Sequence, residues 1–268
     1  MVKSIFVPLN GMESDRAALE TAKSVALHFG ARVTGLHVRL DTSSALAMVA
    51  HETTWRIERE QREQSGAARA DFDRVLKAAA QPLDIRWSEI EGYPLYEHAF
   101  HGRMHDLVVV AREKRLPSQI GELLMQTGRP IIIAPPRAAQ TFGQSVLVAW
   151  NNSAESARAV TAAMPVLVKA KKIVIACVPE ALADAQETSQ SLEELRELLA
   201  LHGLAAETKT LPGSQGAEGD ALREAAYASG CDLIVMGAYG HSRLREYVFG
   251  GATREILREC AVPVLMFH

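Results

Sequence analysis

The sequence has few cysteines, no long apolar run and no long basic run. Its three cysteines, Cys177, Cys231 and Cys260, are odd in number, form no close pair and all fall in the second half of the 268 residues. This distribution argues against a disulfide framework and against a cysteine-based zinc site, and it is typical of a reducing compartment.

The missing apolar and basic runs exclude further classes of protein. No apolar stretch approaches the roughly 20 residues that a membrane helix needs. The first residues, Met1-Val2-Lys3 before a short apolar strand, do not resemble a signal peptide. The net charge is −3 without a Lys/Arg cluster, so neither a nucleic acid nor an anionic membrane is an expected partner. We therefore expect a cytoplasmic protein.

The chain contains one long internal repeat. The matching segments, in chain order, are 5–10 with 146–151, 106–111 with 232–237, and 129–133 with 262–266. Three pairs in the same order indicate two copies of one domain. We predict domains over 1–138 and 143–268, joined by a short stretch without apolar periodicity.

Short apolar strands alternate with helical segments in each copy. The strand cores are apolar at consecutive positions, which is typical of parallel strands buried on both faces. The expected elements are strands at 4–10, 32–39, 83–89, 106–111 and 130–134, helices at 14–29, 52–80, 93–105 and 118–127, and second-copy strands near 145–150, 172–178, 205–211, 232–236 and 263–267. This order predicts an α/β fold of two tandem, doubly wound, Rossmann-like five-stranded parallel sheets, with ligands at the carboxyl ends of the strands.

The last strand of each copy is apolar and would expose a hydrophobic edge if it were left uncovered. We therefore predict that 130–134 and 263–267 pair with each other, which would make the chain a built-in pseudo-dimer.

The segment 237–253 of the second copy is rich in glycine and links a strand to a helix beginning at Thr253. Glycines at the strand exit allow a ligand to approach the backbone, and the N–H groups of the helix start favour an anion. Arg243 and Arg245 add positive charge. Glycine spacing by itself fits a structural turn that binds nothing equally well.

The spacing of Gly237, Gly240 and Gly250, Gly-x-x-Gly then nine residues then Gly, resembles the ATP loop of the universal stress protein family. The segments 146–153, 232–237 and 262–265 resemble strands of the same family. The resemblance covers nearly the whole chain, once well and once in degraded form. It implies a stress-response or regulatory protein that binds ATP, with or without Mg²⁺. The implied binding residues are Ala149, Asn151, Val178, Met236, Gly237, Gly240, Arg243, Gly250, Gly251, Ala252 and Thr253.

Two of these residues depart from the family pattern. In nucleotide-binding members of the family the residue at the position of Asn151 is usually Asp and contacts the adenosine end, so here the charge is lost while an acceptor remains. Gly251 stands where Ser or Thr is usual, so one hydroxyl contact to phosphate is lost while the backbone N–H remains. Weaker nucleotide binding is the expected consequence.

The first copy lacks the glycine loop. From Ala111 to Pro130 there are 19 positions, against 26 from Gly237 to Pro263, seven fewer. Glu113 falls where phosphates would lie, and Pro117 is a good first helical residue but has no N–H to donate. We predict that this copy is a structural or sensory partner that does not bind ATP. The basic residues at 112, 114 and 115 fit either another anion or, more simply, a solvated loop.

Other patterns carry less chemistry. His98, His101 and His105 share one predicted helix and could face a metal, but without a matching carboxylate or cysteine a partly exposed helix face explains them better. Glu218 and Asp220 border the predicted pocket, where helix capping accounts for them. We predict no metal site and no catalytic residue.

Three functions remain open. The first is ATP-dependent regulation, with ATP hydrolysis at most slow. The second is an interaction module that has lost nucleotide binding, and the third is an enzyme for another adenine-containing ligand, which rests on fold analogy alone. A protein partner and a homodimer are expected for the first.

Overall fold

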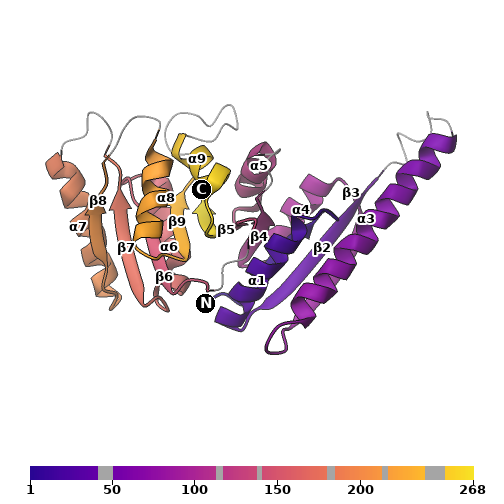
Figure 1. The fold of residues 1–268 in the computed structure, drawn as a ribbon, viewed down its shortest axis with the longest axis horizontal. Helices are drawn as coiled ribbons and strands as arrows, with labels where there is room; N and C mark the ends of the chain where they lie inside the picture. Colours follow the sequence, from indigo (N-terminus) through magenta and orange to yellow (C-terminus); the bar gives the residue numbers. More distant parts are fainter. Residues whose placement is uncertain (42–50, 113–116, 138–140, 180–184, 213–216, 239–250) are drawn as a thin grey trace.

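The computed structural model describes 1–41, 51–112, 117–137, 141–179, 185–212, 217–238 and 251–268, leaving aside the side chains of 51–54, 117 and 118. Strands and helices alternate through both copies (Figure 1). The strands are β1 (Ser4–Leu9), β2 (Arg32–Leu40), β3 (Ile85–Gly92), β4 (Leu107–Ala111), β5 (Ile131–Ala134), β6 (Ser145–Ala149), β7 (Lys172–Cys177), β8 (Glu207–Thr210), β9 (Leu233–Gly237) and β10 (Val264–Phe267). The helices are α1 (Asp15–Phe29), α3 (His51–Lys77), α4 (Pro94–Gly102), α5 (Pro117–Thr127), α6 (Ala154–Leu167), α7 (Ala185–Leu201), α8 (Glu218–Ala228) and α9 (Gly251–Glu259).

These strands form one continuous sheet, in the order β3-β2-β1-β4-β5-β10-β9-β6-β7-β8. Neighbours within each copy are parallel, as in β1 with β4 and β6 with β9. The two last strands, β5 and β10, are antiparallel, with Ile132 opposite Leu265. The structure therefore confirms the α/β class with two tandem parallel halves, and it confirms the predicted pairing of the last strands.

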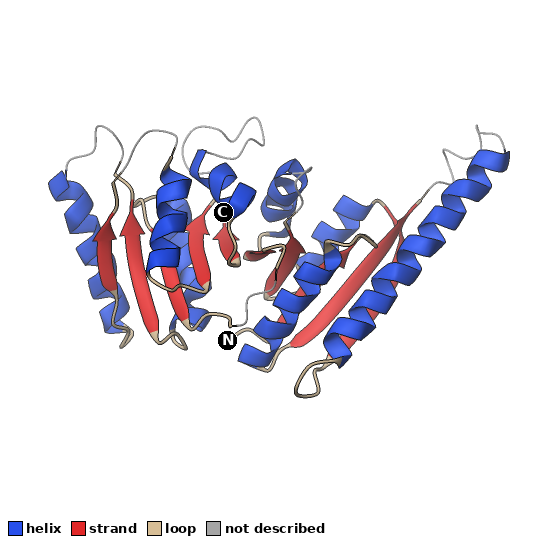
Figure 2. Cartoon of the chain, in the orientation of Figure 1, coloured by secondary structure: helices blue, strands red, loops and turns tan. Residues whose placement is uncertain are grey.

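Successive residues of the central strands face opposite layers of helices. In β1, Ile5 and Val7 pack into one core, and Phe6 between them packs into the other. Helices α1, α3, α6 and α7 contribute to the first core and α4, α5, α8 and α9 to the second, so both faces of the sheet are covered (Figure 2). This two-sided burial is the reason that consecutive strand positions are apolar.

The outermost strands, β3 and β8, have mostly half-buried or exposed side chains. Charged residues on β3 take part in ion pairs with its neighbour, as in Arg39 to Glu89 at 3.0 Å. Such polar edges discourage pairing with another chain. Register also explains why β3 ends at Gly92 and not at the predicted 89, because Gly92 still pairs with Leu40 of the long strand β2.

The joint between the copies is packed. Phe142 is buried, and its ring lies 5.8 Å from that of His28 at the end of α1. Lys169 Nζ donates a hydrogen bond to the carbonyl oxygen of His28 at 2.7 Å. The predicted domain limits, 1–138 and 143–268, lie next to this contact and stay a prediction. Among the described residues, no helix combines the length and the apolarity that a membrane span requires.

Gly143 follows Phe142 and has a φ of +68°, and a Cβ added there would lie 2.7 Å from Cγ1 of Val166. Gly143→Ala should therefore lower the free energy of unfolding through two separate effects. The left-handed backbone costs roughly 1–2 kcal/mol, and overpacking costs about 1–3 kcal/mol more. Urea unfolding measures the loss.

Gly203→Ala is the matched control. Gly203 has a φ of +76° with nothing within 4 Å of an added Cβ, so only the backbone contribution should be lost. Equal losses in the two variants would contradict the packed joint.

Candidate functional site

The carboxyl ends of the central second-copy strands bring together several residues of the predicted site. Ala149, the last residue of β6, is the register partner of Met236 in β9. Val178 directly follows β7, the other neighbour of β6. Asn151 lies two residues beyond β6. The carboxyl edge predicted for a ligand therefore collects Ala149, Asn151, Val178 and Met236, as expected for a doubly wound sheet.

Asn151 takes part in the turn that starts α6. Its Oδ1 accepts hydrogen bonds from Ser153 Oγ at 2.7 Å and from the Ser153 backbone N–H at 3.3 Å. Ser153 Oγ in turn caps the helix by accepting from the Ser156 N–H at 3.2 Å. The side-chain oxygen of Asn151 is thus engaged within this turn.

Gly237 has a packing role that the sequence did not reveal. A Cβ on Gly237 would lie 2.6 Å from the carbonyl carbon of Glu155 and 2.6 Å from the backbone nitrogen of Ser156. The first turn of α6 therefore requires glycine at this position whether or not a ligand binds.

The start of α9 lies beside the start of α8. A Cβ added to Gly219 of α8 would lie 2.5 Å from the carbonyl oxygen of Ala252, and Glu255 accepts a hydrogen bond from the Gly219 N–H at 2.9 Å. A Cβ on Gly251 would have Glu218 Oε2 as its nearest neighbour, at 3.8 Å. Thr253, another predicted site residue, is buried.

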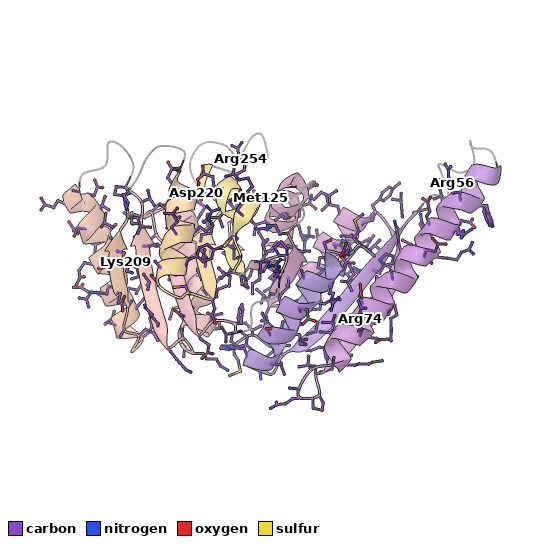
Figure 3. The ribbon with its side chains drawn as sticks, viewed as in Figure 1. Arg56, Arg74, Met125, Lys209, Asp220 and Arg254 are labelled. Atoms are coloured by element: carbon purple, nitrogen blue, oxygen red, sulfur yellow. The ribbon has the colours of Figure 1, made fainter. Side chains whose placement is uncertain are left out.

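Two charged residues near this helix start were not assigned a ligand role from the sequence. Arg254 is exposed and directly follows Thr253 (Figure 3). Its place in the sequence, one residue after the predicted site, could have indicated that it lies near a ligand. Glu218 carries the opposite charge next to Gly251, at a helix end whose dipole favours anions. Predicted residues Gly240, Arg243 and Gly250 lie outside the described residues.

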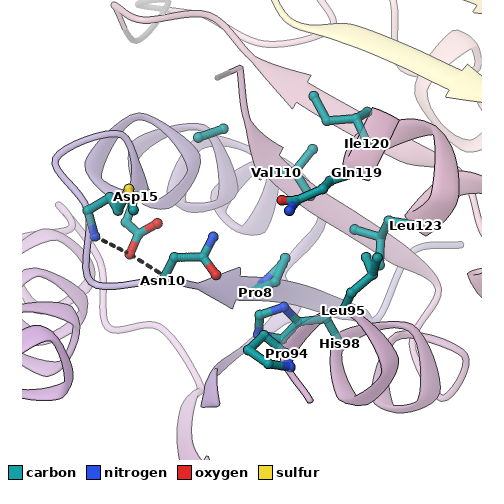
Figure 4. Close-up of a pocket in the computed structure, with 12 residues that line it drawn as sticks. Pro8, Asn10, Asp15, Pro94, Leu95, His98, Val110, Gln119, Ile120 and Leu123 are labelled. Carbon is teal, nitrogen blue, oxygen red and sulfur yellow. Dashed lines mark hydrogen bonds between the residues drawn. The ribbon is translucent and has the colours of Figure 1, made fainter. Parts of the chain in front are cut away.

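The corresponding edge of the first copy has a cavity of about 300 Å³ between β1, β4, α4 and α5 (Figure 4). Asn10, the counterpart of Asn151, lines it. Asp15 also lines it, and its Oδ2 accepts hydrogen bonds from the N–H groups of Asn10, Gly11 and Met12 at 2.9, 2.7 and 3.3 Å. In the first copy, the carboxylate of Asp15 therefore holds the turn between β1 and α1. In the second copy, Ser153 holds the corresponding turn between β6 and α6. Helix α5 begins at Pro117, as its residue type indicated.

The three histidines of the predicted helix at 93–105 do not converge. His98 is buried and lines the cavity, which corrects the expectation of a partly exposed helix face. His101 faces Glu97, with 3.7 Å between His101 Nε2 and Glu97 Oε2, and His105 Nδ1 lies 3.1 Å from the carbonyl oxygen of His101. Within the described part of the chain, no three His, Cys, Asp or Glu side chains could jointly hold a metal.

The three cysteines are buried thiols. Burial raises the pKa of Cys231 and of Cys260 above the usual range. A raised pKa disfavours the reactive thiolate, which fits a packing role for these thiols.

Comparison with known proteins identifies the relatives of this fold. The sequence model described as the universal stress protein family matches residues 1–119 and 144–268. A universal stress protein structure from Archaeoglobus fulgidus covers 98% of this chain and 97% of its own at 16% identity, with a TM-score of 0.75.

Two further relatives agree with this match. A Pseudomonas aeruginosa structure of the same description covers 99% of this chain and 93% of its own at 16% identity, with a TM-score of 0.60. Universal stress protein Slr1230 of Synechocystis is 51% identical over 37 residues, which are 14% of this chain and only 13% of that relative's length. The structures show the fold.

His98 generates a prediction about acid stability. Burial and the neighbouring His37 lower the pKa of His98 from 6.5 to about 4. As the pH falls, His98 of the unfolded chain is therefore protonated before His98 of the folded chain. The free energy of unfolding should fall by about 3 kcal/mol between pH 6.5 and 4, and this contribution should be fully present above pH 6.5. His98→Leu should remove that fall, as measured by urea unfolding across this range.

His101→Leu, on the exposed side of the same helix, should keep the wild-type pH dependence. If the free energy of unfolding depended on pH in the same way in the wild type and in His98→Leu, His98 would not be a buried histidine with a lowered pKa.

Proposed function

This chain belongs to the universal stress protein family, and we propose that its second domain binds ATP, with or without Mg²⁺, as a regulatory ligand. The observation that carries the proposal is the carboxyl edge where Ala149, Asn151, Val178 and Met236 gather. A Rossmann-like sheet binds nucleotides at this edge. The glycine spacing of Gly237, Gly240 and Gly250 supports phosphate binding above it.

The start of α9 supports the phosphate end of this site. Gly251, Ala252 and Thr253 form its first residues, and the first backbone N–H groups of a helix attract anions. Arg254 adds an exposed positive charge one residue further on. Arg243, in the preceding loop, belongs to the proposal through its sequence position.

We propose binding, not catalysis, as the activity. ATP occupancy would change the affinity of the protein for a partner protein, in the cytoplasm and as a homodimer. These parts of the proposal rest on the family and on the composition of the chain.

A second candidate, an interaction module without nucleotide, has one observation in its favour. The carboxylate of Glu218 lies next to Gly251, where the phosphate chain of ATP would meet the helix start. Like charges repel there, and the effect would be removed with the charge.

Glu218→Gln decides between the two candidates. If ATP binds at this helix start, the variant should bind it about two- to fivefold more tightly, because charges near a helix end contribute about 0.3–1 kcal/mol. Calorimetry on the full-length protein at fixed salt and magnesium gives the dissociation constant and should show one ATP per chain.

Glu207→Gln is the matched control, because Glu207 is an exposed acid at the amino end of β8, whereas the proposed site lies at the carboxyl ends of the strands. It should bind like the wild type. If neither the wild type nor Glu218→Gln binds ATP, the interaction module becomes the better description, and two ATP per chain would overturn the assignment to one domain.

Asn151→Asp tests the adenosine end. The aspartate keeps an oxygen for Ser153 and adds the charge usual in nucleotide-binding members. Charge-assisted hydrogen bonds are stronger than neutral ones, so a roughly three- to tenfold gain in ATP affinity is expected.

Asn10→Asp makes the same change at the matching position of the first copy and should leave ATP affinity unchanged. A gain in Asn10→Asp with none in Asn151→Asp would move the nucleotide to the first copy.

A further inference from the structure

The cavity of the first copy has no part in the nucleotide proposal. Its volume of about 300 Å³ is at the lower end of the range for small-molecule sites. Most of its wall is apolar and includes Pro8, Leu95, Val110, Ile120 and Leu123. A ligand in this cavity would be held mainly by apolar contact.

One buried polar group in the wall lacks a partner. His98 is 5% exposed, and its Nε2 is buried without a hydrogen-bond partner in the described part of the chain. Buried polar atoms are almost always hydrogen-bonded in folded proteins, because leaving one unpaired destabilises the folded state. An unpaired imidazole in the wall of a cavity is therefore evidence for a missing partner.

The surroundings of the ring determine what that partner must offer. The backbone carbonyl of Leu36 interacts with the ring, and burial with the nearby His37 keeps the pKa of His98 at about 4. The ring is therefore neutral near pH 7, with one N–H and one bare nitrogen. A carbonyl can only accept, so the N–H is directed to Leu36 and the bare nitrogen remains. The partner must donate a hydrogen bond.

Packing alone does not require a histidine at this place. Helix α4 buries His98 and Gly102 four residues apart, and α8, its counterpart in the second copy, buries Leu222 and Ala226 at the same spacing. The corresponding helix of the second copy therefore buries a leucine and no histidine, so the buried imidazole is particular to the first copy.

The other polar groups of the wall select against an anion. Asn10 from the turn after β1, His98 from α4 and Gln119 from α5 border the cavity together (Figure 4). The described lining includes the Asp15 carboxylate and contains no lysine or arginine. Among the described lining residues, a phosphate or carboxylate would meet a negative charge and neither lysine nor arginine, which favours an uncharged ligand.

We propose that the first-copy cavity binds an uncharged, mostly apolar small molecule that donates a hydrogen bond to the imidazole of His98. The chain would then carry two different ligands, a nucleotide in the second copy and this molecule in the first.

Indole and benzothiophene are suitable probes, because they share a two-ring shape and differ in having N–H or sulfur. Each is titrated into full-length protein carrying ¹⁵N-labelled histidine. Indole should bind roughly tenfold more tightly than benzothiophene, and it alone should move the ring ¹⁵N resonances of His98 through a new hydrogen bond.

His98→Leu should abolish the tenfold preference, whereas His101→Leu, on the exposed side of the same helix, should keep it. Melting curves establish that each variant is folded, and the His98 resonances of the wild type decide the matter if His98→Leu is not. Equal affinities for the two probes, no binding of either at millimolar concentration, or unmoved His98 resonances would overturn the proposal.

ATP added to the indole complex distinguishes this proposal from the nucleotide proposal. The two ligands should bind together, because they occupy different copies. Displacement of indole by ATP would overturn the uncharged-ligand assignment, while a protein that binds indole but no ATP would leave it intact and reject the nucleotide proposal.

Discussion

The antiparallel contact between β5 and β10 is the constraint on which the rest of the structure depends. Three residues of each strand pair across it, Ile131 to Ile133 with Val264 to Met266, and all six are buried. Without it, each copy would end in an apolar edge strand that could pair with another chain. The contact converts two five-stranded sheets into one sheet of ten and fixes how the two candidate sites are placed.

Much of this arrangement could be predicted from the sequence, because it depends on local patterns. The repeat, the runs of consecutive apolar residues and the apolar last strands predicted the class, the parallel halves and the β5–β10 pairing. Boundaries were less accurate where tertiary register decides them, as for Gly92, which pairs with Leu40 because β2 is long. Helix α9 likewise includes Gly251, two residues before the predicted start at Thr253.

The sites were harder to predict, because they depend on which side chains meet in space. The cavity beside His98 forms between residues of five elements, β1, α1, α4, β4 and α5, and no spacing along the chain predicts it. Gly237 looked like a residue that admits a ligand, yet the backbone of Glu155 and Ser156 already excludes a side chain there. The glycine at this position therefore meets a packing requirement that the sequence pattern alone does not reveal.

The direction of the β5–β10 pairing also gives α9 contacts with both copies. Because the strands are antiparallel, the carboxyl ends of β4 and β5 lie beside the amino end of β10. Arg112, the residue after β4, donates a hydrogen bond from Nη1 to the carbonyl oxygen of Cys260 at 2.7 Å, directly beyond the last turn of α9.

Helix α9 therefore begins at the proposed phosphate end of the second copy, and the residue after its end contacts Arg112 of the first copy. Arg112 directly follows Ala111, which lines the cavity. A ligand that shifted the start of this helix would change its far end as well, since a packed helix moves largely as a unit. Any coupling would be reciprocal. A molecule beside His98 would change the affinity for the nucleotide by the same factor by which the nucleotide changes the affinity for that molecule. The degraded copy would then be the part of the chain that adjusts the response of the intact one.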